Sequence, residues 1–391
     1  MAVPKIRIKG YTDEWSEKLL SQIATMHARI GWQNLRKDEF LSDGDYYLIT
    51  GTDFIDGNVN YKTCHYVDEE RYNQDKNIQL KNGSILVTKD GTLGKVAYIE
   101  KLDKPATLNA GVFNIVCRTK HTDSRYLFQY LKSPLLMNYV YSTAIGGTIK
   151  HLNQNVLVKF PINMPCFDEQ VILGKFFQSL DSLIEATGKK IATLKQTKQA
   201  SLQSMFPQEG ETKPRVRFKG FEGDWKKVTL GDIADIYQPQ TIGANYFTEK
   251  GYDVYGANGI IGKYTEYNHI TNQSMIACRG SNCGVVNHSQ GKCWINGNAM
   301  VINVDNYDIY KLFMYFLLQN QDFSSIISGS GQPQIVRGPL QQWNLLIPFD
   351  TEEQQTIASY FQNLDNQITL QTQRLEKLKQ IKSACLKNMF V

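Results

Sequence analysis

The stretch that decides the fold occurs twice, as EQVILGKFFQSLDSLIEATGKKIATLKQTKQASLQSMF at residues 169–206 and as EQQTIASYFQNLDNQITLQTQRLEKLKQIKSACLKNMF at residues 353–390. The copies align without a gap at an offset of 184, and 15 of their 38 positions are identical. In each copy a seam of residues advances by alternating steps of four and three, from Leu173 to Met205 and from Ile357 to Met389. Such heptad spacing is typical of a coiled coil. We therefore predict two long helices that pair with each other.

The simpler alternative is two unrelated surface helices, each of which buries its own apolar stripe. The polar residues of the seams argue against it, because Thr187 and Gln371 fall at the same register, and so do Lys198 and Lys382. Polar seam positions help to fix which residues face each other in a coiled coil. Neither copy contains proline, and Pro207 directly after the first copy predicts the end of that helix.

The start of the chain is duplicated as well. Residues 4–24 and 214–234 match at an offset of 210, with eight of 21 positions identical. Fainter matches follow in order, among them Lys89-x4-Gly94 opposite Arg279-x4-Gly284. We therefore treat Lys89 and Arg279 as equivalent positions in a chain that reads globular unit, helix, globular unit, helix.

The predicted fold class is α+β, with two mixed α/β domains separated by two long helices that form an antiparallel coiled coil, all related by an internal pseudo-two-fold duplication. The boundaries we expect are 1–167 and 214–351 for the domains, 168–206 and 352–391 for the helices, and 207–213 for a linker. Short strand-type runs are predicted at Ser84–Thr88, Lys95–Ile99, Phe113–Cys117, Ser274–Cys278, Gly284–Asn287 and Met300–Val304. Each domain also has one helical pattern, at Ser124–Tyr139 and Asp308–Asn320.

Composition excludes several classes of protein. Of the 391 residues, 42% are apolar and 21% charged, which is ordinary for a globular protein and excludes a disordered or fibrous chain. The charge of 43 − 38 = +5 permits nucleic-acid binding without requiring it. The longest apolar run, Leu312–Leu318, is far shorter than the ~20 residues of a membrane-spanning helix, and we expect no membrane association. Seven scattered cysteines without a secretory signal predict reduced thiols and a cytoplasmic location.

Motifs that would identify an enzyme are missing from the sequence. Gly262-Lys263 is followed by Tyr264, where a phosphate-binding loop needs serine or threonine. No GxGxxG, HExxH or GxSxG occurs, and the six histidines show no pairing at i, i+4. Cys278, Cys283 and Cys293 lie near one another but lack a CxxC pair, so we predict no zinc site. The sequence predicts neither a catalytic residue nor a metal site.

Glycine-rich polar loops that carry single cations remain as candidates for function. Glycine lets a backbone approach a ligand closely, and Arg, Lys, Asn and Gln side chains hydrogen-bond the edges of bases. Tight turns in β-rich domains would look similar, but such loops occur at corresponding places in both copies, which favours a recognition surface. The candidate DNA-binding residues are Lys89, Thr92, Lys95, Thr148, Lys150, His151, Tyr255, Asn258, Lys263, Arg279, Ser281, Asn282, Gln332, Gln334 and Arg337.

At this point the chain resembles a known family, the specificity subunits of Type I restriction–modification systems. The resemblance covers essentially the whole chain and depends on the order domain, helix, domain, helix more than on any single motif. The motifs are P-x-[IV]-R-[IF]-x-G-[YF] at both repeat starts, G-D-Y-Y at Gly44–Tyr47, Y-G-A-N-G at Tyr255–Gly259, G-Q-P-Q at Gly331–Gln334, and Glu-Gln at Glu169-Gln170 and Glu353-Gln354. The first domain departs from this pattern, with Gly146-Gly147-Thr148-Ile149-Lys150 where the second has Gly-Gln-Pro-Gln.

The resemblance implies a non-catalytic subunit whose two domains each read one half of an asymmetric, bipartite target in double-stranded DNA. It further implies that the helices act as a spacer and dock two methyltransferase subunits, and that restriction subunits join the complex. S-adenosylmethionine, ATP and Mg²⁺ are then expected on the partner subunits, with no cofactor bound by this chain.

Two other functions stay open from the residues alone. One is a solitary DNA-binding regulator with two recognition domains and no methyltransferase partner, which co-purification of partners would distinguish. The other is a stand-alone nuclease or methyltransferase, against which the missing catalytic motifs weigh.

Overall fold

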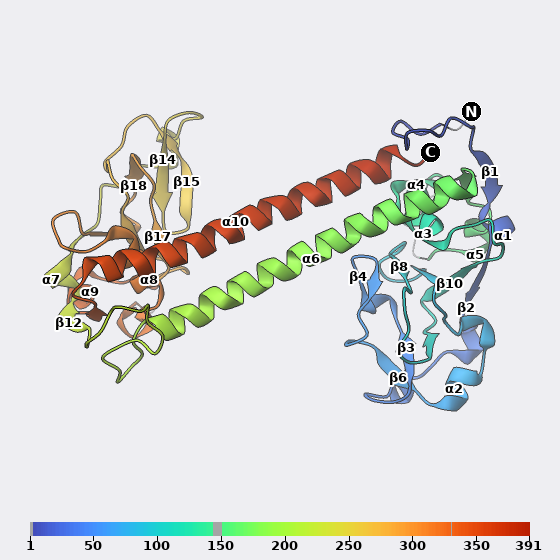
Figure 1. The fold of residues 1–391 in the computed structure, drawn as a ribbon, viewed down its shortest axis with the longest axis horizontal. Coiled ribbons are helices and arrows are strands. Elements are labelled where there is room, and N and C mark those ends of the chain that lie inside the picture. Colours follow the sequence, from blue (N-terminus) through green and yellow to red (C-terminus); the bar gives the residue numbers. More distant parts are fainter. Residues whose placement is uncertain (1–2, 144–150, 330) are drawn as a thin grey trace. The chain divides into compact units, whose positions relative to one another are not determined.

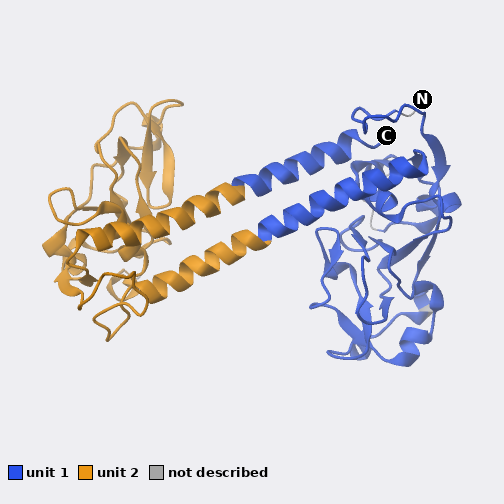
Figure 2. Cartoon of the chain, in the orientation of Figure 1, with its two compact units in different colours: residues 1–188, 373–391 blue, residues 189–372 orange. Residues whose placement is uncertain are grey.

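The computed structural model describes residues 3–143, 151–329 and 331–391, without the side chain of Trp32. The chain divides into two compact units, and each unit contains residues from both repeats (Figure 2). Unit 1 comprises residues 1–188 together with 373–391, and unit 2 comprises residues 189–372. Each long helix is therefore shared between the two units.

Unit 1 is built on a four-stranded antiparallel sheet in the order β2-β10-β7-β8, of which β2, β10 and β8 are labelled in Figure 1. Phe113 of the central strand β10 lies opposite Ala28 of β2 and Val87 of β7. Helix α3 packs on β8. A smaller sheet in the order β6-β3-β9 contains a parallel pair, β3 with β9. The elements of these sheets are β2 (Ala24–Ala28), β3 (Tyr46–Ile49), β6 (His65–Val67), β7 (Ile85–Thr88), β8 (Val96–Tyr98), β9 (Ala106–Leu108), β10 (Val112–Cys117) and α3 (Ser124–Lys132).

Unit 2 repeats this architecture. Its main sheet has the order β13-β19-β16-β17, again antiparallel, with α8 packed on β16 and β17, and its smaller sheet β15-β14-β18 again holds one parallel pair. The duplication and all six predicted strands are confirmed. The elements are β13 (Asp235–Tyr237), β14 (Tyr252–Gly256), β15 (Gly259–Tyr264), β16 (Ser274–Ala277), β17 (Val286–His288), β18 (Cys293–Ile295), β19 (Ala299–Asn303) and α8 (Lys311–Gln319).

Shorter elements complete the two units. In each unit a two-stranded ladder joins the start of the repeat to the strand that precedes the long helix, as β1 with β11 and as β12 with β20. The remaining helices and strands are β1 (Ser16–Leu19), α1 (Leu20–Ile23), β4 (Phe54–Ile55), β5 (Asn58–Val59), α2 (Glu69–Asn73), α4 (Pro134–Thr143), α5 (Gln154–Leu157), β11 (Pro161–Met164), β12 (Lys226–Thr229), α7 (Leu230–Ile233), α9 (Arg337–Gln341) and β20 (Asn344–Ile347). None of the helices among the described residues is long and apolar enough to span a membrane.

One helix prediction is wrong in part. The pattern at Ser124–Tyr139 forms two helices, because α3 ends at Lys132 and α4 begins at Pro134. Proline disfavours the helical conformation in the residue before it. Ser133 is accordingly extended, with ψ of 164°, and its N–H still donates to the carbonyls of Gln129 and Tyr130.

The two long helices are α6 (Phe167–Met205) and α10 (Thr351–Asn388). All ten seam positions in each helix are buried or half-buried. In unit 1 the helices run antiparallel, since Phe177 stacks on Phe390 while Asp181, one turn further along α6, pairs with Lys382, two turns earlier on α10. In unit 2 the equivalent pair is Lys198 with Asp365, at 2.7 Å. The predicted pairing is therefore found in both units.

The helix ends close the cores of the two units. Phe206, just after α6, is 1% exposed in the core of unit 2, with its ring centroid 5.8 Å from that of Phe361 and 6.0 Å from that of Trp225. Phe390, just after α10, is 3% exposed in the core of unit 1, where it lies 5.4 Å from Phe177. Each core is thus completed by the helix end that arrives from the other repeat.

A buried ion pair ties the start of each repeat to its long helix. The guanidinium of Arg7 donates two hydrogen bonds of 2.9 Å to Glu169, and that of Arg217 donates bonds of 2.7 and 2.8 Å to Glu353. Both carboxylate side chains are only 1% exposed. Forked pairing with two parallel bonds is the strong geometry for arginine and carboxylate. The pairs explain why these residues match between the repeats.

Replacement of Phe390 by alanine tests the closure of the unit 1 core. We expect Phe390→Ala to lower the free energy of unfolding of unit 1 by about 3–5 kcal/mol, as for other buried phenylalanines. Urea unfolding followed by hydrogen exchange, which reports on each unit separately, measures this loss. The control Ile381→Ala removes an exposed apolar side chain (41%) from the same helix and should cost no more than about 0.5 kcal/mol. Equal destabilisation of residues 189–372 would contradict this account.

Candidate nucleic-acid interface

A glycine-rich turn between β7 and β8, residues 88–95, is held in unit 1 by its own backbone. The N–H of Thr88 donates to the carbonyl of Lys95, and the N–H of Gly94 donates to the carbonyl of Thr88, both at 3.0 Å. A third bond, of 2.9 Å from the N–H of Leu152 to the carbonyl of Lys89, fastens a distant part of the chain to this turn. We call residues 88–95 the first turn.

The turn between β16 and β17 in unit 2, residues 277–285, has the same three bonds. The N–H of Ala277 donates to Val285 and the N–H of Gly284 donates to Ala277, both at 2.8 Å. The N–H of Ile335 donates to the carbonyl of Cys278 at 3.1 Å. This second turn therefore presents its side chains from the same backbone scaffold as the first.

These bonds correct the predicted equivalence of Lys89 and Arg279. The carbonyl of Lys89 accepts the bond that the carbonyl of Cys278 accepts in unit 2, so Arg279 corresponds to Asp90. The next residues, Gly91 and Gly280, agree, because both have left-handed φ values, of 71° and 84°. The second turn is longer by one residue. The sequence match aligned Gly94 with Gly284 at the end of each turn, and it therefore placed the start of the turns one residue out of step.

Two other loops of unit 2 contact the second turn. The N–H of Gly280 donates to the carbonyl of Pro333 at 3.0 Å, and Arg279 forms an isolated antiparallel bridge with Gln334. The side chain of Asn282 donates to the side-chain oxygen of Asn258 in the β14–β15 turn. The structure therefore brings together six of the predicted residues, Asn258, Arg279, Ser281, Asn282, Gln332 and Gln334, and all except the half-buried Asn282 are exposed.

In unit 1 the corresponding surface carries a different set of side chains. Lys89 is half-buried, with its ammonium 5.7 Å from the ring centre of Phe113. Thr92 and Lys95 are exposed on the first turn. The exposed His151 lies with Nδ1 2.5 Å from Oδ1 of Asp90. Two other predicted residues, Thr148 and Lys150, lie outside the described residues.

Three predicted residues of unit 2 do not join this cluster. Tyr255 is 6% exposed and packs in an apolar cluster with Met275 and Ile295, and this burial raises the pKa of Tyr255. Its ring is part of the core, which corrects its place among the candidate residues. Lys263 on β15 pairs with Asp253 at 2.7 Å, and Arg337 is exposed at the start of α9.

Asp90 is not among the predicted residues, although Lys89 and Thr92 of the same loop are. Its contact with His151, 61 positions away, becomes visible only in the folded chain. The available signal was its place inside a glycine-rich turn, next to Gly91.

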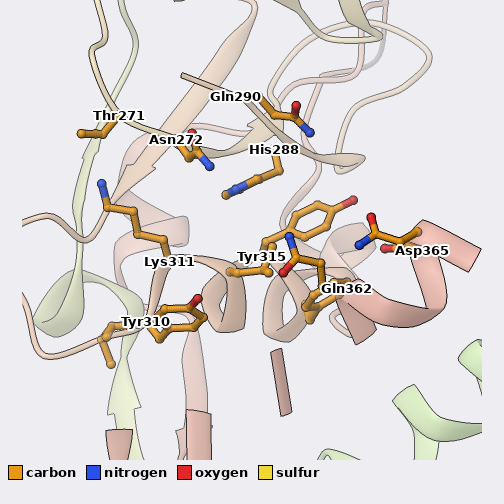
Figure 3. Close-up of a pocket in the computed structure, with 13 residues that line it drawn as sticks. Thr271, Asn272, His288, Gln290, Tyr310, Lys311, Tyr315, Gln362 and Asp365 are labelled. Atoms are coloured by element: carbon orange, nitrogen blue, oxygen red, sulfur yellow. The ribbon is translucent and has the colours of Figure 1, made fainter. Parts of the chain in front are cut away.

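A cavity of about 920 Å³ lies in unit 2 between β17, α8 and α10 (Figure 3). Burial, together with the ammonium of Lys311, lowers the pKa of His288 in its wall to about 4, so this imidazole is neutral. The nearby carboxylate of Asp305 is held by Lys311 and by Thr271, at 3.0 Å from the latter. Throughout the described parts of the chain, no three His, Cys, Asp or Glu side chains gather as a metal-binding group. Among the described residues that line the cavity, the one carboxylate is that of Asp365, which pairs with Lys198 at 2.7 Å.

Comparisons with known proteins agree with this architecture. The family model described as Type I restriction modification DNA specificity domain matches residues 12–196 and again residues 222–380. The specificity subunit of the Type I restriction enzyme EcoBI from Escherichia coli is 22% identical over 191 residues, which cover 48% of this chain and 40% of that protein. The matched region thus spans less than half the length of this relative.

Solved structures share the fold along the whole chain. The S subunit of a Type I restriction-modification system from M. genitalium superposes with a TM-score of 0.70 at 17% identity and covers 99% of both chains. A chain from a structure on the assembly and conformational transition of the type I R-M system gives a TM-score of 0.54 at 16% identity, over 96% of this chain and 97% of that one.

The loop at residues 328–335 offers a matched pair of substitutions. Gly329 has φ of 98°, and a Cβ there would lie 2.4 Å from the carbonyl oxygen of Gln332, whereas a Cβ on Gly331 meets nothing within 4 Å. We expect Gly329→Ala to open the loop, at a cost of about 1–3 kcal/mol, and Gly331→Ala to leave it intact. Hydrogen exchange of the Ser328 and Gln334 amides, which bond each other's carbonyls at 2.8 Å, measures the difference. The same protection in both variants would contradict the assigned loop geometry.

Proposed function

Because the chain belongs to the family of Type I restriction–modification DNA specificity subunits, we propose that it is the sequence-reading subunit of such a complex. Each unit binds one half of a bipartite, asymmetric target in double-stranded DNA. The chain itself performs no catalysis. It directs the catalytic subunits to the target.

The observation that carries this proposal is one backbone scaffold, present in both units, that presents different side chains in each. In unit 2 the exposed side chains are Arg279, Gln334 and their amide neighbours, whose donors and acceptors suit base edges in the major groove. In unit 1 the same places hold Asp90 and His151. Equal scaffolds imply the same mode of approach to DNA. Different side chains imply that the two half-sites differ in sequence.

The partner subunits are proposed from exposed apolar residues that occur twice. Phe167 at the start of α6 and Phe349 just before α10 are 41% and 76% exposed. Ile6 and Val216, at matching positions of the two N-terminal segments, are 49% and 53% exposed. Exposed aromatic and aliphatic side chains beside polar surface are typical of protein–protein contacts. A surface present in two copies fits a partner bound in two copies, and we propose two methyltransferase subunits docked along the long helices.

Restriction subunits and cofactors complete the proposed assembly. S-adenosylmethionine, ATP and Mg²⁺ bind to the methyltransferase and restriction subunits. This chain contributes the contacts to DNA and the platform that positions those subunits.

Substitution of Arg279 tests whether the second turn reads a base. We expect Arg279→Ala, in the complex with methyltransferase, to weaken binding to the target duplex by roughly 1–3 kcal/mol and to leave binding to a non-target duplex nearly unchanged. Fluorescence anisotropy titrations on both duplexes measure this difference. Arg118→Ala, which removes an exposed arginine just after β10 in unit 1, is the control. Equal weakening on all duplexes would identify a phosphate contact, and no change would remove the second turn from the DNA surface.

The absence of catalysis by the isolated chain is tested directly. The purified chain, incubated with target DNA, Mg²⁺, ATP and S-adenosylmethionine, should neither cleave nor methylate the DNA. Addition of the methyltransferase subunit should start methylation. Radiolabelled methyl transfer and gel analysis of the DNA measure both activities. Turnover by the chain alone, with partner subunits verified absent by mass spectrometry, would contradict the proposal.

A further inference from the structure

The matched scaffolds place two pairs of residues at the same position of the two units. Asp90 corresponds to Arg279, since each follows the residue whose carbonyl accepts the third scaffold bond. His151 corresponds to Gln334, since each precedes the residue that donates that bond. This inference rests on the proposed function and names the residues that make the two half-sites different.

In unit 2 the pair consists of hydrogen-bonding groups free to meet a base. The guanidinium of Arg279 is exposed and has no ion pair or hydrogen bond with any described residue. Its backbone is fixed by the bridge to Gln334, and Gln334 is fixed in turn by two bonds of 2.8 Å with Ser328. An arginine with a fixed backbone and an unpaired guanidinium can donate two hydrogen bonds to O6 and N7 of guanine. A glutamine side chain can form two hydrogen bonds with N6 and N7 of adenine. The pair therefore suits a purine, and Arg279 selects guanine.

In unit 1 the residue that corresponds to the donor Arg279 is the hydrogen-bond acceptor Asp90. The side chain of Asp90 is 40% exposed, and its Oδ1 lies 2.5 Å from Nδ1 of His151. This contact fixes one carboxylate oxygen and leaves Oδ2 without a hydrogen bond to the described residues. A carboxylate only accepts, so in the major groove it pairs with an exposed amino group, such as N4 of cytosine. His151 acts as a positioning residue that orients the carboxylate.

We propose that Asp90 with His151 in unit 1, and Arg279 with Gln334 in unit 2, occupy one and the same base-reading position of the two half-sites. Arg279 reads guanine in the half-site of unit 2, and Asp90 reads the amino group of cytosine in the half-site of unit 1. Exchange of the two pairs therefore exchanges the base preference at one position of each half-site and leaves the other positions as they are.

The experiment exchanges the pairs in the full chain, assembled with its methyltransferase subunits, and maps the methylated sites on random-sequence DNA. The variants are Asp90→Arg/His151→Gln and, separately, Arg279→Asp/Gln334→His. Each should change one base pair of one half-site, with the opposite half-site unchanged. Asp45→Arg and Arg118→Asp make the same charge changes at exposed positions outside the turns and the long helices, and should leave both half-sites as they are. An unchanged base preference in both exchange variants would overturn the inference.

A second measurement covers the case in which an exchange variant no longer methylates any DNA. The milder Asp90→Asn and Arg279→Gln are then titrated against duplexes that differ at single base pairs of one half-site. Discrimination at one base pair should fall by roughly 5- to 150-fold, and discrimination elsewhere should persist. Full discrimination at every base pair would overturn the inference. The wild-type complex separates this result from the proposed function, because failure of the wild type to methylate any bipartite site contradicts the function itself.

Discussion

The rest of the structure depends on the phenylalanine that follows each long helix. This side chain inserts into the core of the unit that the other repeat builds. Phe206 reaches Trp225 and Phe361, and Phe390 reaches Phe177. The chain end strengthens the second of these contacts, since the carbonyl of Val391 accepts bonds of 2.5 and 2.6 Å from side chains of unit 1. Neither repeat closes its own core. Because each core needs the phenylalanine from the other repeat, both heptad segments end in Met-Phe. For the same reason each long helix is divided between the two units.

Polar contacts then fix the register of the helices within each unit. Lys198 donates bonds of 2.7 and 2.8 Å to Asp365, and Lys382 pairs with Asp181 at the equivalent place. A half-buried ion pair adds little net stability, but a register that separated its members would leave a charge without a partner. The forked pairs of Arg7 and Arg217 fix the start of each repeat in the same way. The duplicated scaffold that carries the candidate interface rests on these contacts.

The sequence predicts the parts of this structure that follow from local periodicity. Heptad spacing identifies α6 and α10, short β-type runs identify the strands of both main sheets except β2 and β13, and the constant offsets identify the duplication. The sequence-based prediction fails where a single residue ends a helix or lengthens a turn. Pro134 divides a helix that looks continuous, and a one-residue insertion in the second turn shifts the match between Lys89 and Arg279.

The candidate interface was predictable only as a set of loops. Tyr255 is aromatic and sits in a polar motif, yet the strand order directs its ring into the core. Asp90 contacts His151, which is 61 positions away along the chain. Contacts of this kind depend on how the strands pair, and strand pairing is a property of the whole domain. Sequence patterns therefore locate the candidate loops but not which side chains of different loops contact each other.

The central claim is that one chain with two equivalent scaffolds reads two different half-sites. The most direct measurement is the sequence of all sites methylated on genomic DNA by the wild-type chain assembled with its methyltransferase subunits. The account predicts a single motif made of two unlike specific segments separated by a gap of unspecified bases and of constant length. A continuous motif, two identical segments, or methylation of the same sites by the methyltransferase without this chain would contradict it.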